Sequence, residues 1–275
     1  MKSFKDALEE GTKYLIEHNI DNGKVDAWHL FSHLININRA DYFLHSGKEI
    51  SNLQYNQYMD LIKKRADNLP LQYIIGYQDF MGLKIKVNKD VLIPRLDTEV
   101  LVEEILKVSK GKDVLDLCTG SGCIIISLMK YGSINSGIGA DISKNALAIA
   151  RENATINWLD VNFVESDLFS NVEDKFDIIV SNPPYIPKND ISGLSKEVRD
   201  HEPHLALDGK EDGLYYYRQI AKELKEYLRP KGFVFFEIGY NQAEALTKIL
   251  EAEGIEEIEV LKDLAGLDRI IKGRL

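Results

Sequence analysis

The apolar residues in the first part of the chain are spaced as they are in amphipathic helices. Segments 4–20, 24–38 and 51–68 each place apolar side chains three and four residues apart, which is the repeat of one helix face. Ser51 stands where the N-cap of the third helix is expected. The pattern therefore predicts a small N-terminal helical bundle over residues 1–72.

A different pattern follows this bundle. Residues 73–94 form a β-like stretch interrupted by Gly76 and Gly82, which predicts a β-hairpin linker. Over residues 95–275, short apolar runs such as DVLDLC alternate with helical patterns such as GCIIISLMKYG. This alternation is typical of βαβ units with helices on both faces of a sheet. Because five such runs precede a final two-stranded hairpin pattern, we expect an α/β fold with a Rossmann-like, seven-stranded, mainly parallel sheet.

The composition is that of an ordinary globular protein, with 44% hydrophobic and 28% charged residues. No run of 18 apolar residues occurs, and five of the first ten residues are charged. We therefore expect no membrane span, no signal peptide and a cytoplasmic location. The net charge of −10 arises after residue 90, since the first 90 residues hold 12 basic and 12 acidic residues. An acidic second part argues against a nucleic-acid substrate. Two cysteines, and two histidines at 201 and 204, do not complete a metal ligand set, so no metal is expected.

The sequence SNPPY at residues 181–185 directly follows the apolar run FDIIV. Its two prolines, Pro183 and Pro184, fix φ and lack backbone donors, so the strand cannot continue as a paired ladder. Asn182 is held extended because a proline follows it. The segment therefore presents an amide side chain, free carbonyl groups and the ring of Tyr185 at the carboxyl end of a buried strand.

Three other strand ends carry residues that suit a nucleoside ligand. The first strand runs into CTGSG at residues 118–122, where glycines allow a sharp turn and the next helix begins with free N–H groups. The second ends at Asp141, an acid placed to bind ribose hydroxyls, and the third ends at Asp167, beside an adenine edge. A full G-x-G-x-x-G cradle for pyrophosphate is missing, so S-adenosyl-L-methionine fits better than NAD. The expected cofactor-binding residues are Cys118, Thr119, Gly120, Ser121, Gly122, Asp141, Ile142, Asp167, Leu168 and Asn182.

With these residues in view, the chain resembles class I (Rossmann-like) methyltransferases that methylate a planar amide or amino nitrogen. The segments DLCTGSG, ADIS, SDLF and SNPPY, in this order, carry the resemblance, although NPPY is shared with adenine-specific DNA methyltransferases. The stretches PLQYIIGYQDFMG, VLIPRLDTEVLVE, HEPHLALDGKEDGLYYYRQI and EIGYNQ are similar to the release-factor glutamine methyltransferases, the HemK/PrmC family.

This resemblance implies methyl transfer from S-adenosyl-L-methionine to a glutamine side-chain amide nitrogen. In the family, that glutamine lies in the Gly-Gly-Gln motif of class I peptide chain release factors, and the reaction supports translation termination. The Asn182 side-chain oxygen and the Pro183 carbonyl are placed to accept its two N–H groups, and the N-terminal bundle is the expected docking site for the protein partner. The expected catalytic and substrate-binding residues are Asn182, Pro183, Pro184 and Tyr185, with Phe80 as a further substrate-binding residue.

The chain departs from the family's pattern at three positions. Leu96 stands where proline is common, Cys118 where glycine is frequent, and Leu168 where some members have an aromatic residue. A leucine still packs on a purine face, but it stacks less strongly. A structural role is expected for Glu237, and supporting roles are expected for Arg95, Thr98, Glu99, Glu202 and Pro203.

Two other functions stay open at this point. An adenine-N6 nucleic-acid methyltransferase would share NPPY, but it would need a basic groove and wedge residues for base flipping, which the sequence does not indicate. A non-catalytic module that binds S-adenosyl-L-methionine would have no use for a motif that orients an NH2 group.

Overall fold

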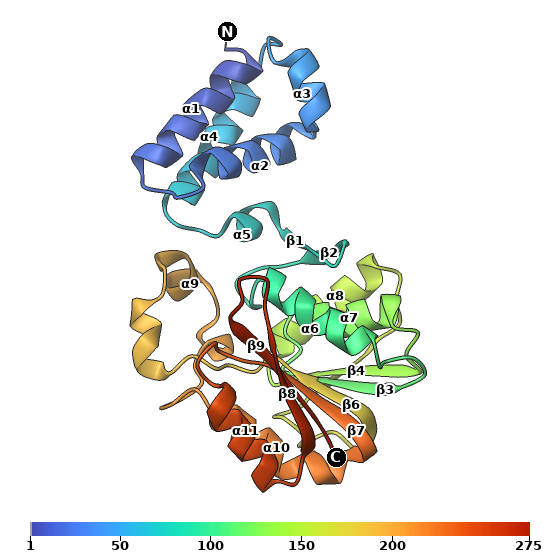
Figure 1. The fold of residues 1–275 in the computed structure, drawn as a ribbon. Helices are drawn as coiled ribbons and strands as arrows, with labels where there is room; N and C mark the ends of the chain where they lie inside the picture. Colours follow the sequence, from blue (N-terminus) through green and yellow to red (C-terminus); the bar gives the residue numbers. More distant parts are fainter. Residues whose placement is uncertain (1) are drawn as a thin grey trace. The chain divides into compact units, whose positions relative to one another are not determined.

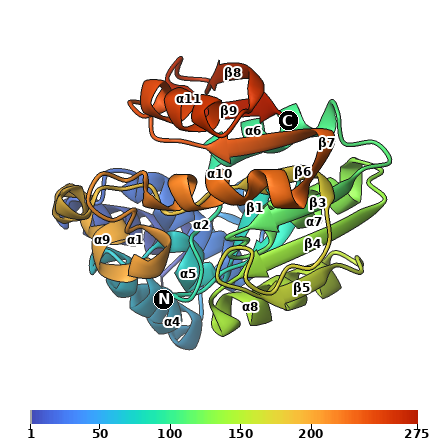
Figure 2. The ribbon, with the colours of Figure 1, turned by 90° about the horizontal axis from the view of Figure 1, so that it is seen from below.

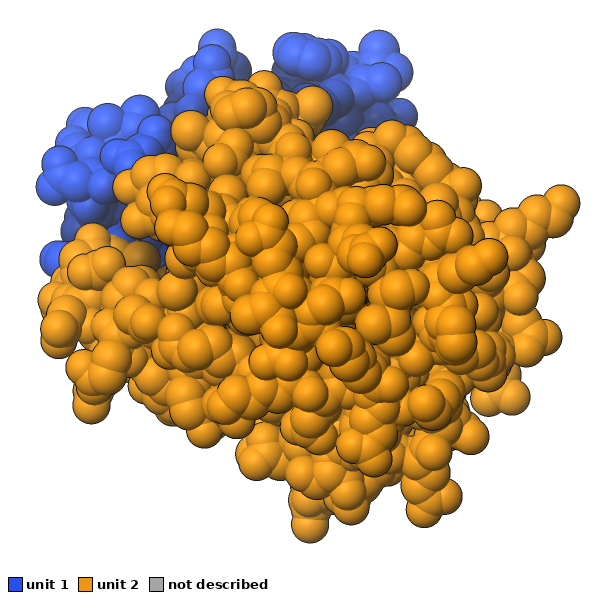
Figure 3. Space-filling model, turned by 60° about the horizontal axis from the view of Figure 1, so that its bottom comes forward, with its two compact units in different colours: residues 1–76, 195–201 blue, residues 77–194, 202–275 orange. Residues whose placement is uncertain are grey.

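The computed structural model describes residues 2–275 and divides the chain into two compact units (Figure 3). The first unit comprises residues 1–76 and 195–201, and the second comprises residues 77–194 and 202–275. Each unit has its own hydrophobic core. Residues 195–201, which belong by sequence to the predicted segment 95–275, thus pack with the first unit.

The first unit is helical, as the apolar spacing predicts (Figure 1). Ser51 caps α4, because its hydroxyl accepts a hydrogen bond from the Gln54 backbone N–H at 3.2 Å while the Gln54 side chain accepts one from the Ser51 N–H. The sequence does not predict α3 and α5, since helices of seven and five residues contain too few turns to display a repeat. The helices are α1 (Phe4–Glu17), α2 (Gly23–Ile35), α3 (Arg39–His45), α4 (Asn52–Ala66), α5 (Leu71–Ile75) and α9 (Lys196–His201).

Aromatic side chains and one buried ion-pair cluster hold this unit together. The fully buried ring of Phe31 makes edge-on contacts with Phe4 and Tyr58, both at 5.4 Å between ring centroids. Arg65 of α4 is also buried, and its Nε donates to Asp26 Oδ2 of α2 at 2.7 Å. Its Nη2 donates to Glu197 Oε2 at 2.7 Å, which fixes α9 to the same helix.

The second unit begins with the predicted hairpin of β1 (Tyr77–Phe80) and β2 (Leu83–Lys86). Phe80 pairs with Leu83, so Met81 and Gly82 alone form the turn. Both have positive φ, 51° and 71°, as a type I′ hairpin turn requires. The Met81 N–H donates to Glu99 Oε1 at 2.6 Å, which anchors the turn to the first helix after the hairpin.

A seven-stranded sheet forms the centre of the second unit and confirms the predicted fold (Figures 1 and 2). The strand order is β5-β4-β3-β6-β7-β9-β8, and only β9 runs against the others. The chain moves outward from β3 to β5 and then returns to the other side of β3, so β3 and β6 flank the point where a doubly wound sheet binds its ligand. The strands are β3 (Asp113–Leu117), β4 (Ser136–Asp141), β5 (Asn162–Glu165), β6 (Phe176–Ser181), β7 (Leu228–Glu237), β8 (Glu256–Lys262) and β9 (Asp268–Arg274).

Helices cover both faces of this sheet (Figure 1). On one face, α10 (Tyr215–Tyr227) and α11 (Ala243–Ala252) pack on alternate strand residues such as Leu115, Leu117 and Phe236. The opposite face carries α6 (Leu96–Leu106), α7 (Cys123–Tyr131) and α8 (Lys144–Ile156). The 3-10 helices η1 (Lys188–Gly193) and η2 (His204–Ala206) lie in the loops after β6. No helix within residues 2–275 is both long and apolar enough to span a membrane.

Candidate active site

A cavity of about 240 Å³ lies at the carboxyl ends of the strands in the second unit. Its walls come from the loops that follow β3, β4, β5 and β6, which meet at this edge because the strands are parallel. The structure brings together at this cavity the predicted residues Cys118, Thr119, Gly120, Ser121, Asp141, Ile142, Asp167, Leu168, Asn182 and Pro184.

The loop after β3 turns through left-handed backbone conformations. Cys118, Gly120 and Gly122 have φ of 59°, 56° and 78°. A glycine at Cys118 would adopt this conformation without strain, which accounts for the expected preference for glycine there. Gly122 is the N-cap of α7, and a Cβ on it would lie 3.0 Å from Cδ1 of Ile126. The absence of a side chain at Gly122 therefore lets α7 start close to the sheet with its free N–H groups at the cavity.

Asp141 is held rigidly at the end of β4. Its Oδ2 accepts a hydrogen bond from the Gly120 N–H at 2.9 Å, and its Oδ1 accepts one from the Ser143 N–H at 2.8 Å. Burial raises the pKa of this carboxyl, while the two backbone donors oppose the shift. A carboxylate that is fixed by backbone donors and still lines the cavity is suited to accept hydrogen bonds from vicinal hydroxyl groups.

A second acid, Asp116, lies inside β3 directly beneath the loop. Its Oδ2 accepts a hydrogen bond from the Thr119 hydroxyl at 2.6 Å, and burial raises its pKa to about 7. The nearby N–H of Ile125 in α7 lowers this pKa slightly, but Oδ1 has no partner with ordinary hydrogen-bond geometry among the described residues. A buried carboxylate oxygen without a partner is costly, so this position is suited to a donor or a cation from outside the chain.

The turn after β5 brings Asp167 and Leu168 to the same cavity. The Ser166 N–H donates to the Asp141 carbonyl at 2.9 Å, and the Ser166 hydroxyl donates to the Leu168 carbonyl at 2.7 Å. These two bonds place the apolar side chain of Leu168, which has a φ of 49°, beside the acid that ends β4. The pairing of an acidic and an apolar residue is suited to the edge and the face of a purine.

The SNPPY segment leaves β6 in a conformation that is fixed on several sides. The Ser181 hydroxyl donates to the Leu117 carbonyl at 2.7 Å, and the Gln242 side chain donates to the Tyr185 carbonyl at 3.0 Å. A Cβ on Gly213 would lie 2.3 Å from that same carbonyl oxygen, so a larger residue does not fit there. Burial raises the pKa of Tyr185 to about 12, so its hydroxyl is neutral at physiological pH.

Four predicted site residues do not line the cavity. Gly122 and Pro183 are chain neighbours of lining residues, and Tyr185 packs against the hydrophobic core of the second unit. Phe80 is 1% exposed within the hairpin. Their predicted roles in binding and catalysis stay predictions.

The sequence analysis missed much of the opposite wall. That wall includes residues 89–92 after the hairpin, Leu205 and Ala206 of the loop after β6, and Tyr216 of α10. Of the residues predicted to support the site, Arg95, Thr98 and Pro203 line the cavity. Arg95 pairs with Glu202 at 2.5 Å between Nη2 and Oε1. No local pattern marks residues 89–92, because a loop that follows a hairpin has no periodicity to read.

Comparisons with known proteins identify the family. The family model for the PrmC N-terminal domain matches residues 6–76, and the model for the methyltransferase small domain matches residues 95–210. A release factor glutamine methyltransferase of Geobacter sulfurreducens is 39% identical over 264 residues, which cover 95% of this chain and 93% of that protein. The protein of the same name from Clostridium acetobutylicum is 40% identical over 275 residues, which cover 97% and 96% of the two chains.

A solved structure of another methyltransferase has a similar fold. The 16S rRNA N2 G1207 methyltransferase of T. thermophilus, solved in complex with AdoMet and guanosine, is similar with a TM-score of 0.51. It is 18% identical, and the match covers 72% of this chain and 49% of that chain, so it supports the fold alone. The relatives at 39% and 40% identity, together with the two family models, establish more: the chain belongs to the release factor glutamine methyltransferase family.

Proposed function

We propose that this protein transfers a methyl group from S-adenosyl-L-methionine to the side-chain amide nitrogen of a glutamine in class I peptide chain release factors. The glutamine is the one in their Gly-Gly-Gln motif. One observation carries the proposal: Asn182 and Pro184 of the SNPPY segment line the same cavity as the loop at 118–121 and Asp141. An amide-binding motif and a nucleoside-binding edge thus face one space.

The residues of the cavity fit the proposed cofactor. Asp141 is placed for the ribose hydroxyls, and Asp167 with Leu168 for the adenine. Asp116 does not line the cavity itself, but its Oδ1 has no partner with ordinary hydrogen-bond geometry among the described residues, which suits the ammonium group of a methionine moiety. When bound, S-adenosyl-L-methionine supplies a methyl group that its sulfonium has already activated.

The chain's own residues have to align the acceptor and stabilise its developing charge. A glutamine amide is a poor nucleophile because its nitrogen lone pair is delocalised into the carbonyl. The Asn182 side-chain oxygen and the Pro183 carbonyl would accept its two N–H groups, which fixes the NH2 group and favours positive charge on nitrogen. Tyr185 is neutral, so it acts as a packing surface or a donor and not as a base.

We further propose that the first unit contributes to binding of the release factor. A Gly-Gly-Gln loop is small, so affinity has to come from other parts of the partner. Phe43 and Leu44 of α3 are 71% and 78% exposed and offer apolar contacts. Replacing both with serine should raise KM for the whole release factor and leave cofactor affinity unchanged, whereas Trp158→Ser, at a site that is 92% exposed in the second unit, should change neither.

Methyl transfer from labelled S-adenosyl-L-methionine tests the activity. A purified release factor, its Gln→Ala variant in Gly-Gly-Gln, and unmethylated DNA serve as the three acceptors. Label on the wild-type factor alone is expected. Label on DNA would instead favour adenine methylation, and label on both forms of the factor would contradict the assigned acceptor atom.

The role of Asn182 has its own test. Asn182→Ala should lower kcat by about 100-fold or more, as expected when one positioned hydrogen-bond partner of a transition state is lost. Cofactor affinity should change little. Asn189→Ala is the matched control, because Asn189 lies in η1 of the same loop but is exposed and outside the cavity. An equal effect of both substitutions would show that Asn182 does not hold the acceptor.

A further inference from the structure

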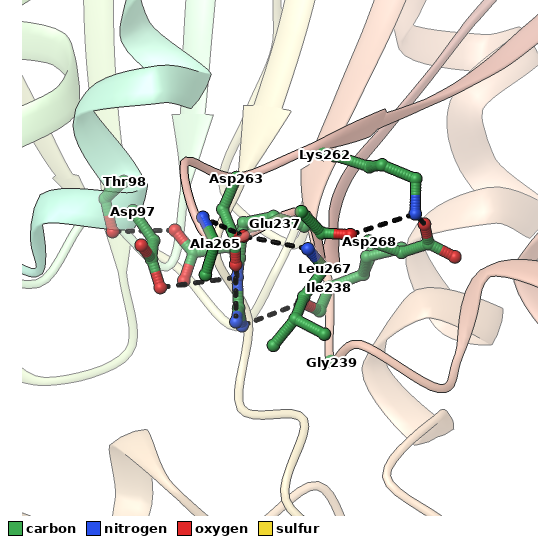
Figure 4. Close-up of polar contacts among 12 residues, drawn as sticks. Asp97, Thr98, Glu237, Ile238, Gly239, Lys262, Asp263, Ala265, Leu267 and Asp268 are labelled. Carbon is green, nitrogen blue, oxygen red and sulfur yellow. Dashed lines mark hydrogen bonds and ion pairs between the residues drawn. The ribbon is translucent and has the colours of Figure 1, made fainter.

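A buried carboxyl group lies directly behind the wall of the cavity. Glu237 is the last residue of β7 and is 2% exposed. Its Oε2 accepts a hydrogen bond from the Thr98 hydroxyl of α6 at 2.6 Å (Figure 4). Its backbone carbonyl accepts a hydrogen bond from the Tyr217 hydroxyl at 2.6 Å, which fixes this end of the strand from the other face. The sequence suggested only a structural acid at this position.

The sheet register places this carboxyl beside Asn182. In the parallel pair of β6 and β7, Ser181 lies opposite Phe236, so the next residues, Asn182 and Glu237, leave neighbouring strand ends on the same face. Asn182 and Thr98 both line the cavity, whereas Glu237 does not. Burial raises the pKa of Glu237 to about 7, and hydrogen bonds from Thr98 and Asn182 oppose this shift.

Further contacts hold the acid and its neighbour in place (Figure 4). Arg269 donates to the carbonyl of Ile238, the residue after Glu237, at 3.3 Å. The same guanidinium pairs with Asp263 at 3.1 Å and with Asp97, the residue before Thr98, at 3.4 Å. Arg269 therefore fixes both chain segments that carry the Thr98–Glu237 hydrogen bond. Because the Glu237 carboxyl is fixed in this way, it can determine the orientation of the Asn182 side chain beside it.

The orientation of the Asn182 amide decides whether a donor or an acceptor faces the cavity. The two ends of an asparagine amide have nearly the same shape, and only their partners decide which end faces which way. Above about pH 7, where the Glu237 carboxyl is ionised, it accepts hydrogen bonds and cannot donate them, so it selects the NH2 end of Asn182. The oxygen of Asn182 is then left to face the cavity.

We propose that Glu237 is a positioning residue that binds the amide nitrogen of Asn182 and so presents its oxygen to the N–H group of the acceptor. This inference rests on the proposed function, because an exposed acceptor oxygen is useful only if the acceptor carries an NH2 group. It assigns to Glu237 a role beyond the support of the fold. A role in the fold alone would be met by the hydrogen bond from Thr98 and would not involve Asn182.

Two substitutions separate these roles. Glu237→Gln keeps a carbonyl oxygen that can accept from Asn182, and Glu237→Leu keeps the approximate size but removes the acceptor. For Glu237→Leu we expect kcat to fall by about 100-fold, the order seen when one positioned partner of a transition state is lost, with the cofactor Kd changed less than about threefold. For Glu237→Gln we expect kcat to stay within about tenfold of the wild type, because the acceptor is retained.

The substitutions should also depend on Asn182. If Glu237 acts through Asn182, adding Glu237→Leu to Asn182→Ala should lower kcat no further. Additive losses would overturn the proposal, as would a wild-type kcat in Glu237→Leu. If Glu237→Leu does not fold, Glu237→Gln decides: a loss as large as that of Asn182→Ala, at unchanged cofactor Kd, would also overturn it.

A readout that needs no acceptor distinguishes this proposal from the proposed function. The side-chain NH2 signals of Asn182 are assigned in a ¹⁵N–¹H spectrum by their absence in Asn182→Ala. In Glu237→Leu they should move and broaden, because the fixed partner is gone. Unmoved signals would refute the contact. Failure of the wild type to methylate a release factor would refute the proposed function, but it would not affect the conclusion that Glu237 binds the amide nitrogen of Asn182.

Discussion

The buried ion-pair cluster of the first unit should make Arg65 one of its most sensitive positions. The side chains of Arg65 and Asp26 are each 8% exposed, and Glu197 is 31% exposed. Arg65→Met keeps most of the apolar stem but leaves the Asp26 carboxylate buried without a cation. It also removes the hydrogen bond from Arg65 Nη1 to the Leu69 carbonyl at 3.2 Å.

The size of the effect follows from these burials. Removal of one partner of a buried pair costs about 3–5 kcal/mol, because a charge stays buried without compensation. Asp26 lies in the first turn of α2, where the helix dipole stabilises its negative charge and offsets about 0.3–1 kcal/mol of this loss. The partly exposed pair with Glu197 adds at most about 1 kcal/mol. The last two contributions roughly cancel, so we expect Arg65→Met to lower the free energy of unfolding by about 3–5 kcal/mol.

The chain contains a natural probe for this measurement. Trp28 is 6% exposed in the first unit, and its ring packs edge-on against Tyr42 at 5.3 Å, so its fluorescence should change when the unit unfolds. Trp158, the other tryptophan, is 92% exposed in the second unit and should change little. Urea titrations in a Trp158→Phe background then report the first unit alone.

Matched variants define the outcome that would refute this reasoning. Lys63→Met removes an exposed pair with Asp60 on the same helix, at 3.9 Å, and should cost less than about 0.5 kcal/mol. Adding Asp26→Leu to Arg65→Met should recover most of the loss, because no buried charge is left. If Arg65→Met matched the Lys63 control, the buried pair would not stabilise the unit.

Three further predictions concern the second unit. Because burial raises the pKa of Asp116 to about 7, the protonated carboxyl stabilises the fold fully below about pH 4, and this stabilisation is lost as the pH rises through 7. Between pH 5 and pH 8, the free energy of unfolding of Asp116→Asn, measured by urea titration, should therefore rise by about 2–3 kcal/mol relative to that of the wild type. A difference that does not change with pH would contradict this prediction. Gly122→Ala should lower the free energy of unfolding by about 1–3 kcal/mol more than Gly111→Ala does. Both glycines have positive φ, 78° and 70°, but only a Cβ at Gly122 would lie close to a neighbour, at 3.0 Å from Ile126. Equal unfolding midpoints would show that this close contact has no energetic effect. Asp141→Ala should weaken cofactor binding by about tenfold or more in calorimetry with little change in kcat, and an unchanged Kd would exclude Asp141 from the ribose site.

The centre of the sheet was predictable from the sequence because strands such as β3 and β6 are buried on both faces. Runs such as FDIIV and FVFF are continuous and apolar, and helical repeats separate them, so their parallel arrangement follows. Residues at the carboxyl ends of the parallel strands, such as Asp141 and Asn182, are consequently placed at one edge of the sheet, and they do line one cavity. Local sequence is sufficient where a residue's position depends only on the end of its own strand.

Long-range pairings were not predictable in the same way. Arg65 and Glu197 are 132 positions apart, and no sequence pattern links them, yet their ion pair joins α9 to the first unit. The wall formed by residues 89–92 likewise has no repeat, since its place depends on the anchoring of the preceding hairpin to Glu99. Such contacts depend on how complete elements pack, which a local window does not contain.

The SNPPY motif shows where these two kinds of information meet. Its prolines predict from sequence alone that a strand ends and that an amide is presented there. The motif does not specify which end of that amide faces the cavity, because Asn182 carries a donor and an acceptor of nearly equal shape. We infer that Glu237 sets this orientation; it lies 55 positions later in the chain, and the pairing of β6 with β7 places it beside Asn182. A motif match with a different residue at this strand end would therefore conserve the geometry of the loop and lose the direction of its hydrogen bond.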